Sequence, residues 1–447
     1  MSPRRRNWLR WAKWCGLALL LLVILSGLAI IGIRRFAMSH VPQTSPPAGI
    51  VGLLQADVPD DENAFPDYLS ACEKLIPFKG DPPELDNALT VEWPDISGEI
   101  LEWVTANEDA VAIWLRGTTK PQGQLYKARE TVLLMDYDCL PKIRVISTLA
   151  RLNARKALAQ GDAVRSWKYL HALIRCSRHL GQHGVAFERA YGVGVHNYAV
   201  RGILQWAESS HVDAALLDAA ISDTEREFAK TTPISETLLR EYLMVFDSRT
   251  IAGIVEELNA HASVPAWRIY MYAMGEPEIS KTVVSHVFQN WMAEYSKPFG
   301  ARAHRSPWRY GVLFENDSAD SLRPFGKIPY ASLATTMLNG LADFEIRTVR
   351  EESAHAILLT GLVCERYWRD NSRYPSSKQE LPLALATHWP TDPFADGSTA
   401  IRLVPNDDTC LIYSVGQDGV DGGGDFQISL SNQDADFGYL LSKRPIE

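Results

Sequence analysis

The first 60 residues divide into a basic part, an apolar part and a proline-rich part. Trp14–Ile33 is an uninterrupted apolar run, long enough as a helix to cross about 30 Å of hydrocarbon. Arg and Lys residues in 1–13 predict a cytoplasmic N-terminus by the positive-inside rule. Residues 34–60 are rich in Pro and polar residues, which suits an extended linker. The pattern predicts one transmembrane helix; a cleaved signal peptide is the alternative, although its apolar core is typically shorter.

Residues 61–330 are predicted to form an α-helical ectodomain, because apolar positions recur at helical spacing. The clearest unit is Lys142–Leu180, where the apolar stripe breaks at Gln160–Asp162 and then restarts. This break is similar to the turn of a tetratricopeptide-type hairpin, in which Gly leaves the helix and Asp caps the next one. A single copy without a regular period predicts an irregular helical array. Aromatic, Pro and Gly residues in 265–330 predict a loop-rich cover.

Residues 331–447 are predicted to be a long helix followed by a small β module. The stretch 331–370 has no proline and carries an apolar stripe, so it predicts one helix, or two joined at Gly340. Two proline turns, a short apolar strand and a Gly/Asp loop follow. The predicted fold class is therefore mainly α, with a small α+β module at the C-terminus.

Charge and cysteine content narrow the function classes. The 447 residues carry a net charge of −9, although the first 35 contain seven Lys or Arg and no acid. The remainder is strongly acidic, which argues against nucleic acid as a partner. The six cysteines are too scattered for a metal knuckle, and buried free thiols are the expected state. A bridge between Cys364 and Cys410 stays open, because spacing alone cannot decide it.

Three motifs in residues 365–426 carry a family resemblance. Arg366–Leu381 reads R-Y-W-R-D-N-S-R-Y-P-S-S-K-Q-E-L, Pro390–Phe394 reads P-T-D-P-F, and Ile412–Gly419 reads I-Y-S-V-G-Q-D-G. In this order they resemble the helix end, the turn and the strand with its loop in the major pseudopilins of type II secretion systems. The chain departs from that family because no leader cleavage site precedes the anchor and about 330 residues separate the anchor from the motifs. Assembly into a filament is therefore not expected.

The resemblance implies a calcium site in the Gly/Asp loop. Asp418, Asp421 and Asp425 would be the ligands, since calcium prefers six to eight oxygen donors and the neighbouring glycines free backbone carbonyls. The alternative is a solvated turn in which Asp and Gly serve backbone geometry alone. The whole layout also resembles membrane-anchored bacterial envelope proteins, which implies the inner membrane with a periplasmic ectodomain.

Histidines in the helical part raise an enzymatic alternative. His179 and His183 are four residues apart, with Glu188 and His196 nearby, a spacing that suits a metal if one helix carries both. Gly residues interrupt that helix and no H-E-x-x-H motif occurs, so capping or surface roles are expected. No nucleophile elbow or phosphate-binding loop is present in the sequence.

The sequence thus predicts a non-enzymatic, membrane-anchored envelope scaffold that binds a protein partner through its helices. Two alternatives stay open. One is a secretion-system accessory that docks onto pseudopilins, and the other is an envelope hydrolase with its site in the helical body.

Overall fold

The computed structural model describes most of the chain, which divides into two compact units. The first unit comprises Met1–Pro46, Val255–Asn290 and Trp308–Asn339, and the second comprises Pro47–Ile254, Trp291–Pro307 and Gly340–Glu447. The described residues are 3–39, 49–53, 57–80, 82–89, 91, 93–128, 130, 136–246, 288–289, 292–295, 297–302, 332–395, 397–406, 408–424 and 436–442.

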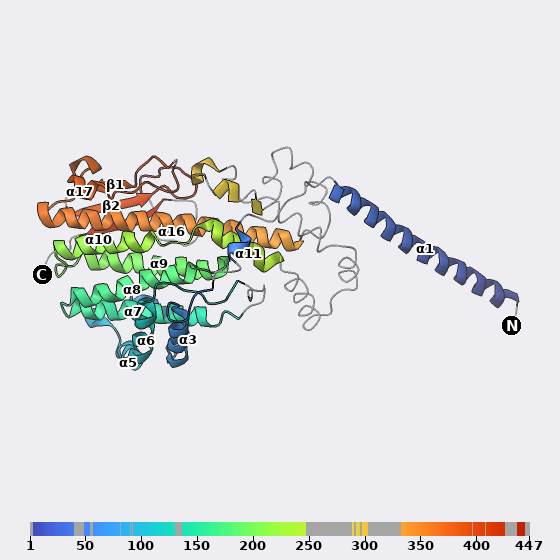
Figure 1. Ribbon diagram of the computed structural model, residues 1–447, viewed down its shortest axis with the longest axis horizontal. Coiled ribbons are helices and arrows are strands. Elements are labelled where there is room, and N and C mark those ends of the chain that lie inside the picture. The colour runs from blue at the N-terminus through green and yellow to red at the C-terminus, as the bar shows by residue number, and fades with distance from the viewer. Residues whose placement is uncertain are drawn as a thin grey trace. The chain divides into compact units, whose positions relative to one another are not determined.

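Helix α1 (Pro3–Ser39) is the main described element of the first unit (Figure 1). Its segment Trp11–Gly32 is long and apolar enough to cross a membrane. The large apolar side chains of this segment are exposed. Its length and composition are consistent with a membrane anchor or a signal sequence. The type of membrane and the orientation stay predictions.

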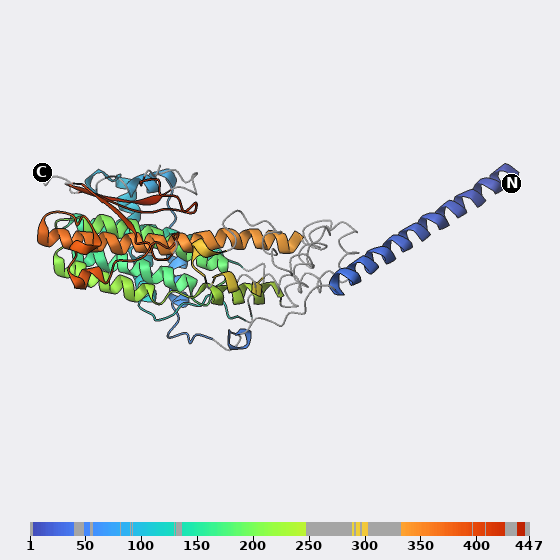
Figure 2. The ribbon, with the colours of Figure 1, turned by 90° about the horizontal axis from the view of Figure 1, so that it is seen from above.

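The second unit is mainly helical, as predicted, and its long helices run alongside one another (Figures 1 and 2). The last long helix, α16, continues through Gly340 without a break, which decides between the two predicted alternatives. Among the described residues its helices are α2 (Ile50–Leu53), α3 (Phe65–Lys74), α4 (Pro82–Ala88), α5 (Gly98–Ala106), α6 (Glu108–Thr118), α7 (Cys139–Ala159), α8 (Ala163–Gly181), α9 (Ala186–Ala207), α10 (Ala214–Phe228), α11 (Ile234–Phe246), α16 (Ser332–Asn371, of which Gly340–Asn371 belong to this unit) and α17 (Leu383–Ala386), with single 3₁₀ turns at Trp93–Asp95, Phe299–Ala301 and Lys378–Glu380.

Helices α7 and α8 form the helix pair that the sequence predicts. Gly161 follows α7 with a φ of +79°, a conformation that residues with a Cβ rarely adopt. Asp162 then caps α8 by accepting a hydrogen bond from Arg165 N at 2.9 Å. Leu149 on α7 and Leu173 on α8 are both fully buried. The likeness to a tetratricopeptide hairpin stays a prediction.

One side chain of helix α16 caps the C-terminal end of α9. Arg369 donates hydrogen bonds to the backbone carbonyl oxygens of Ala207, Ser209 and Val212, at 2.8, 2.9 and 2.9 Å. The last carbonyls of a helix have no partner within the helix itself. A residue distant in sequence therefore satisfies the C-terminal end of α9.

A three-stranded antiparallel sheet follows α16, in the order β1 (Arg402–Pro405), β2 (Thr409–Ser414) and β3 (Phe437–Ser442). It lies on one side of the helices (Figure 2). Glu208, at the end of α9, accepts hydrogen bonds from Tyr439 Oη at 3.0 Å and from the backbone N of β3 at Ser442 at 2.6 Å. These bonds attach the sheet to the helical body.

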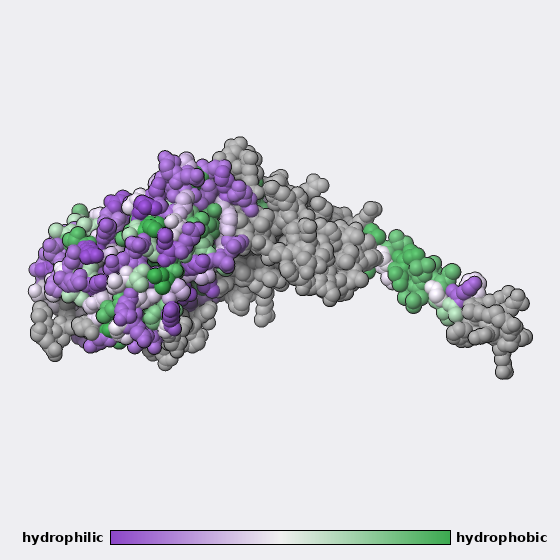
Figure 3. Space-filling view, turned by 90° about the horizontal axis from the view of Figure 1, so that it is seen from below, coloured by the Kyte–Doolittle hydropathy of each residue, from purple (hydrophilic) through white to green (hydrophobic). Residues whose placement is uncertain are grey.

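One hydrophobic core joins the helices to the sheet. It includes the fully buried side chains of Trp114, Leu173, Leu204, Leu362 and Ile412, which come from α6, α8, α9, α16 and β2. The predicted domain boundaries stay predictions, but the helical body and the C-terminal sheet bury their apolar side chains together. On the face of this unit shown in Figure 3, apolar side chains are scattered among polar ones.

Several predicted segments fall partly outside the described residues. The predicted aromatic cover at 265–330 is described only at 288–289, 292–295 and 297–302. The predicted α-helical ectodomain at 61–330 is described as helix as far as Phe246, at the end of α11, and residues 247–287 lie outside the described residues. The predicted linker at 34–60 contains the end of α1 and the short helix α2, so it is not extended throughout.

Candidate functional site

The turn Pro390–Phe394 places one carboxylate inside the second unit. Asp392 is fully buried and accepts hydrogen bonds from Ser414 Oγ at 2.7 Å and Val415 N at 3.0 Å. Arg402 Nη1 also donates to it, at 3.1 Å. A buried carboxylate without partners is costly, so these bonds allow Asp392 to join the turn to β1 and β2.

Arg402 links this turn to the Gly/Asp loop that follows β2. Its Nε donates to Asp421 Oδ2 at 2.6 Å, while Tyr413 Oη and Gly423 N each donate to Asp421 Oδ1 at 3.0 Å. The hydrogen bond from Arg402, with those from the other donors, lowers the pKa of Asp421. A metal ion at this carboxylate would therefore compete with a guanidinium.

Two further carboxylates flank the same loop. Asp418 Oδ1 accepts a hydrogen bond from Val420 N at 2.9 Å, and Asp436 Oδ2 accepts one from Gly424 N at 2.8 Å. The second carboxylate oxygen of Asp436, Oδ1, is buried and has no hydrogen-bond partner among the described residues. Burial and the nearby charges of Asp421 and Asp418 raise the pKa of Asp436. The charges of Asp421 and Asp418 therefore act against ionisation of Asp436 at this end of the sheet.

The calcium ligands predicted from the sequence are only partly placed. Asp418 and Asp421 lie in one loop, and Asp425 lies outside the described residues. Within the described ranges, no group of three or more His, Cys, Asp or Glu side chains is arranged to hold a metal ion. Asp436 was not predicted, because the pairing of β3 with β2 brings it to the loop and no local motif marks it. Its partnerless oxygen is the donor that best fits a hard cation.

The four residues of the predicted enzymatic alternative occupy separate environments. A surface or capping role is wrong for His179, which is buried and hydrogen-bonded to Tyr68 Oη at 2.7 Å. Burial of α8 against the N-terminal helices lowers the pKa of His179 to about 4. His183 lies beyond the end of α8, with Nε2 3.0 Å from Gln122 Oε1, and His196 is fully buried within α9. These histidines do not converge on one point.

Glu188, the fourth residue, caps the start of α9 together with Glu241 of α11. Glu188 Oε2 accepts a hydrogen bond from Val185 N at 2.8 Å, and Glu241 Oε1 accepts one from Ala186 N at 2.6 Å. Both side chains are buried. Burial raises the pKa of Glu188 to about 8 and that of Glu241 to about 7. Two carboxyl groups that titrate near neutrality thus lie at one helix N-terminus.

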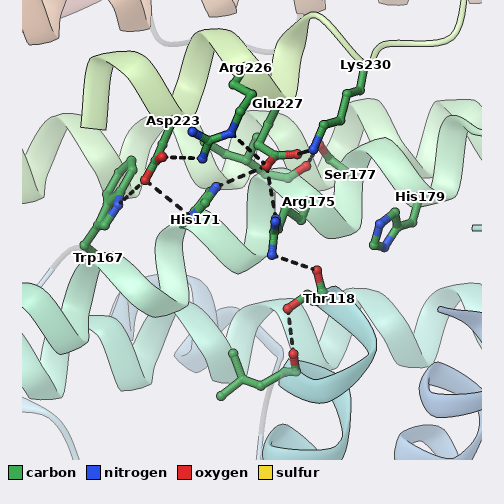
Figure 4. Close-up of polar contacts among 12 residues, drawn as sticks. Thr118, Trp167, His171, Arg175, Ser177, His179, Asp223, Arg226, Glu227 and Lys230 are labelled. Carbon is green, nitrogen blue, oxygen red and sulfur yellow. Dashed lines mark hydrogen bonds and ion pairs between the residues drawn. The ribbon is translucent and has the colours of Figure 1, made fainter. Parts of the chain in front are cut away.

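Glu227 of α10 is also buried, but its surroundings are opposite to those of Glu188 and Glu241, because cationic side chains contact it (Figure 4). Lys230 Nζ donates to its Oε2 at 2.8 Å and Arg175 Nε to its Oε1 at 3.1 Å, and the His171 ring lies 3.5 Å from Oε1. Burial acts to raise the pKa of Glu227, but the hydrogen bonds from these side chains outweigh it and hold the pKa well below its ordinary value. This cluster joins α8 to α10.

Glu351 of α16, also buried, lies between two buried arginines. Arg178 of α8 donates to its Oε1 and Arg189 of α9 to its Oε2, and all three side chains are almost fully buried. The rings of His196 and His355 lie beside each other, with their centroids 5.9 Å apart, and Arg178 is close enough to both to act on their charge. Burial lowers the pKa of both rings far below the ordinary value, so they are neutral at physiological pH.

No protein-family model, curated protein or solved structure shows significant similarity to this chain. The resemblance of residues 365–426 to pseudopilins therefore stays an expectation from the motifs.

Proposed function

We propose that this protein is a membrane-anchored, non-enzymatic interaction protein of the bacterial envelope. Helix α1 holds it in the inner membrane, the helical body binds a protein partner on the periplasmic side, and calcium stabilises the loop after β2. The apolar segment Trp11–Gly32 supports the anchor. The buried carboxylates of the described helices favour a structural role over a catalytic one. Most of them already cap a helix or pair with a neighbouring cation.

The observation that carries the calcium proposal is the carboxylate group at the end of the sheet. Asp436 has a buried oxygen without a hydrogen-bond partner in the described structure, and the charges of Asp418 and Asp421 act on it. Like charges in one place destabilise the folded loop unless a cation neutralises them. Asp418 and Asp436 are the residues that would hold the ion, whereas Asp421 stays paired with Arg402. Calcium would supply a positive charge and oxygen coordination for the loop.

Calcium titration of the full chain in detergent tests this part of the proposal. We expect the melting temperature to rise with calcium, and the rise to disappear in Asp418→Asn and Asp436→Asn. The matched control is Asp370→Asn on α16, which removes an exposed carboxylate far from the loop in sequence and should leave the calcium effect intact. An unchanged melting temperature and no calorimetric heat in the unmodified protein would contradict the calcium site.

Affinity purification from membranes tests the interaction role. The full chain, solubilised in mild detergent at its native level, is expected to recover one or a few proteins in fixed proportion. A protease added to cells whose outer envelope has been opened is expected to digest the body from the outer side of the inner membrane. Recovery of the chain alone would count against a partner, and protection of the body from the protease would reverse the proposed orientation.

Hydrolysis is the second candidate, and one observation favours it. Glu188 and Glu241 are buried carboxyl groups with pKa values raised to about 8 and about 7, and perturbed carboxyl groups often mark active sites. A screen with broad hydrolase substrates should then show an activity that Glu188→Gln abolishes without unfolding the protein. Absence of activity in the unmodified protein leaves the helix-capping role as the full account of these residues.

A further inference from the structure

Two cysteines distant in sequence meet where the sheet packs on α16. Cys364 lies on α16 and Cys410 on β2, and both are fully buried in the main core. Their neighbours place the two elements in contact, since a Cβ on Gly361 would lie 3.7 Å from Ile412 Cδ1. Cys364 is one helical turn beyond Gly361, and Cys410 is two residues before Ile412 on the same face of its strand. The geometry of the packing therefore points the two side chains at each other.

The thiol contact agrees with this placement. The thiols of Cys364 and Cys410 lie close enough to act on each other, and Cys410 also acts on the neighbouring Tyr374. Tyr374 Oη in turn donates to Glu365 Oε1 at 2.7 Å, next to Cys364 on the helix. Both cysteines are free thiols in this structure.

The other cysteines outside the apolar segment of α1 have different neighbours. Cys72 Sγ donates to the backbone carbonyl of Cys139 at 3.7 Å, and the thiols of Cys139 and Cys176 lie close enough to act on Cys72. Cys176 is fully buried and lies against the side chains of Tyr68 and Trp114. Among the described residues, Cys364 and Cys410 are two fully buried cysteines whose thiols act on each other, whereas Cys139, beside Cys72, is only partly buried, so we take the first pair as the one suited to a covalent bond.

We propose that Cys364 and Cys410 form a disulfide that fastens the central strand of the sheet to α16. One thiolate attacks a sulfur of an oxidising disulfide, such as glutathione disulfide or an oxidised protein dithiol, and forms a mixed disulfide. The second thiolate then displaces the oxidant's remaining thiol. The two cysteines lose two protons and two electrons, and the oxidant's disulfide becomes two thiols.

The burial of the pair determines when the bond forms. Burial raises the pKa of the Cys364 thiol well above its ordinary value, so the folded core holds little thiolate. The exchange therefore takes place while the chain folds, before β2 closes over α16. Once formed, the bond is shielded from reductants by the same core. Its occurrence in cells rests on the proposed periplasmic location, because periplasmic proteins are oxidised and cytosolic ones are kept reduced.

Oxidative refolding of the full chain in detergent tests the bond without reference to location. The chain is unfolded, refolded with glutathione disulfide or with a reductant, and its free thiols are alkylated before peptide mapping. We expect a peptide pair joined through Cys364 and Cys410 in the oxidised sample, and a melting temperature about 5 °C above that of the reduced sample. Complete alkylation of both cysteines after oxidative refolding, or bonds to other cysteines in place of this one, would overturn the proposal.

Matched variants distinguish the effect of the disulfide on the melting temperature from the effect of substituting a buried cysteine. In Cys364→Ser with Cys410→Ser, the difference between oxidised and reduced samples should vanish. Cys176→Ser, which alters a cysteine of equal burial, should keep it. Loss of the difference in Cys176→Ser as well would assign the redox effect to another thiol and overturn the pairing. If the bond forms in vitro but cells trapped with acid and alkylating reagent contain the reduced pair, the periplasmic location fails and the pairing stands.

Discussion

Glu227 and Glu241 are both buried glutamates on consecutive helices, α10 and α11, yet their surroundings shift their pKa values in opposite directions. Glu227 is contacted by the side chains of Lys230, Arg175 and His171, which hold its pKa low. Glu241 receives a backbone N–H from the start of α9, and burial raises its pKa to about 7. Glu227 is therefore an anion in the folded protein at neutral pH, whereas Glu241 gains or loses its proton near neutrality. Burial alone therefore does not decide how a carboxyl group contributes to stability; its cationic neighbours do.

Glu351 is, like Glu227, a buried glutamate in contact with cationic side chains, and its two arginines are themselves buried. Glu351→Gln should therefore lower the free energy of unfolding more than the other substitutions. Its removal leaves the guanidinium groups of Arg178 and Arg189 without their carboxylate in an interior where each is at most 3% exposed. Breaking a buried ion pair in this way costs about 3–5 kcal/mol. Urea unfolding followed by circular dichroism measures the loss. The control Asp370→Asn breaks an exposed pair with Arg366 and should cost about 1 kcal/mol or less.

Glu227→Gln should be less costly, because the cations around Glu227 are partly exposed. The Lys230 and Arg175 side chains are 43% and 30% exposed, so solvent can replace part of the lost interaction. We expect a loss of about 1–3 kcal/mol at pH 7. A cost equal to that of Glu351→Gln would show that exposure of the cations is irrelevant.

The pH dependence of the same variant sharpens the comparison. The pKa of Glu227 is lower in the folded chain than in the unfolded one, so its contribution is present above about pH 4.3 and is lost as the pH falls. We therefore measure the free energy of unfolding at several pH values between 3 and 7. It should fall less on acidification in Glu227→Gln than in the unmodified protein.

Glu241→Gln should have the smallest effect and the opposite sign. The folded-state pKa of about 7 lies above the unfolded value of about 4.3, so the folded chain keeps the proton up to a higher pH than the unfolded chain does. Stability from this group is complete below about pH 4.3 and is lost as the pH rises to about 7. A neutral Gln can still accept the bond from Ala186 N, and we expect it to stabilise the protein by about 1–2 kcal/mol at pH 8. Destabilisation at pH 8 would show that the carboxylate charge helps to cap α9.

The features that the sequence predicted are those encoded by neighbouring residues. The membrane-length helix, the turn at Gly161 with its Asp162 cap, and the long helix α16 are each read from one continuous stretch. The Gly/Asp loop belongs to the same class, since its glycines and Asp421 lie within a few residues of one another. Local propensity and spacing are sufficient for these features.

The polar contacts that hold the elements together were not predicted, because their partners are distant in the chain. Asp436 reaches the loop through strand pairing, and Glu351 meets Arg178 through the packing of α16 on α8. His179 was expected at the surface or at a helix cap, since its spacing carries no information about the helix that covers it. Such side chains are ordinary in the sequence and acquire partners only when helices pack.

Glu351 also imposes an order on biosynthesis. Arg178 and Arg189 are synthesised before the ribosome reaches residue 351. Until then, neither arginine can form its ion pair with Glu351. Helices α8 and α9 cannot close around them at low cost during that interval. The helical body therefore completes its folding only after α16 has emerged, so a chain truncated before this helix leaves an incomplete body for proteases to remove.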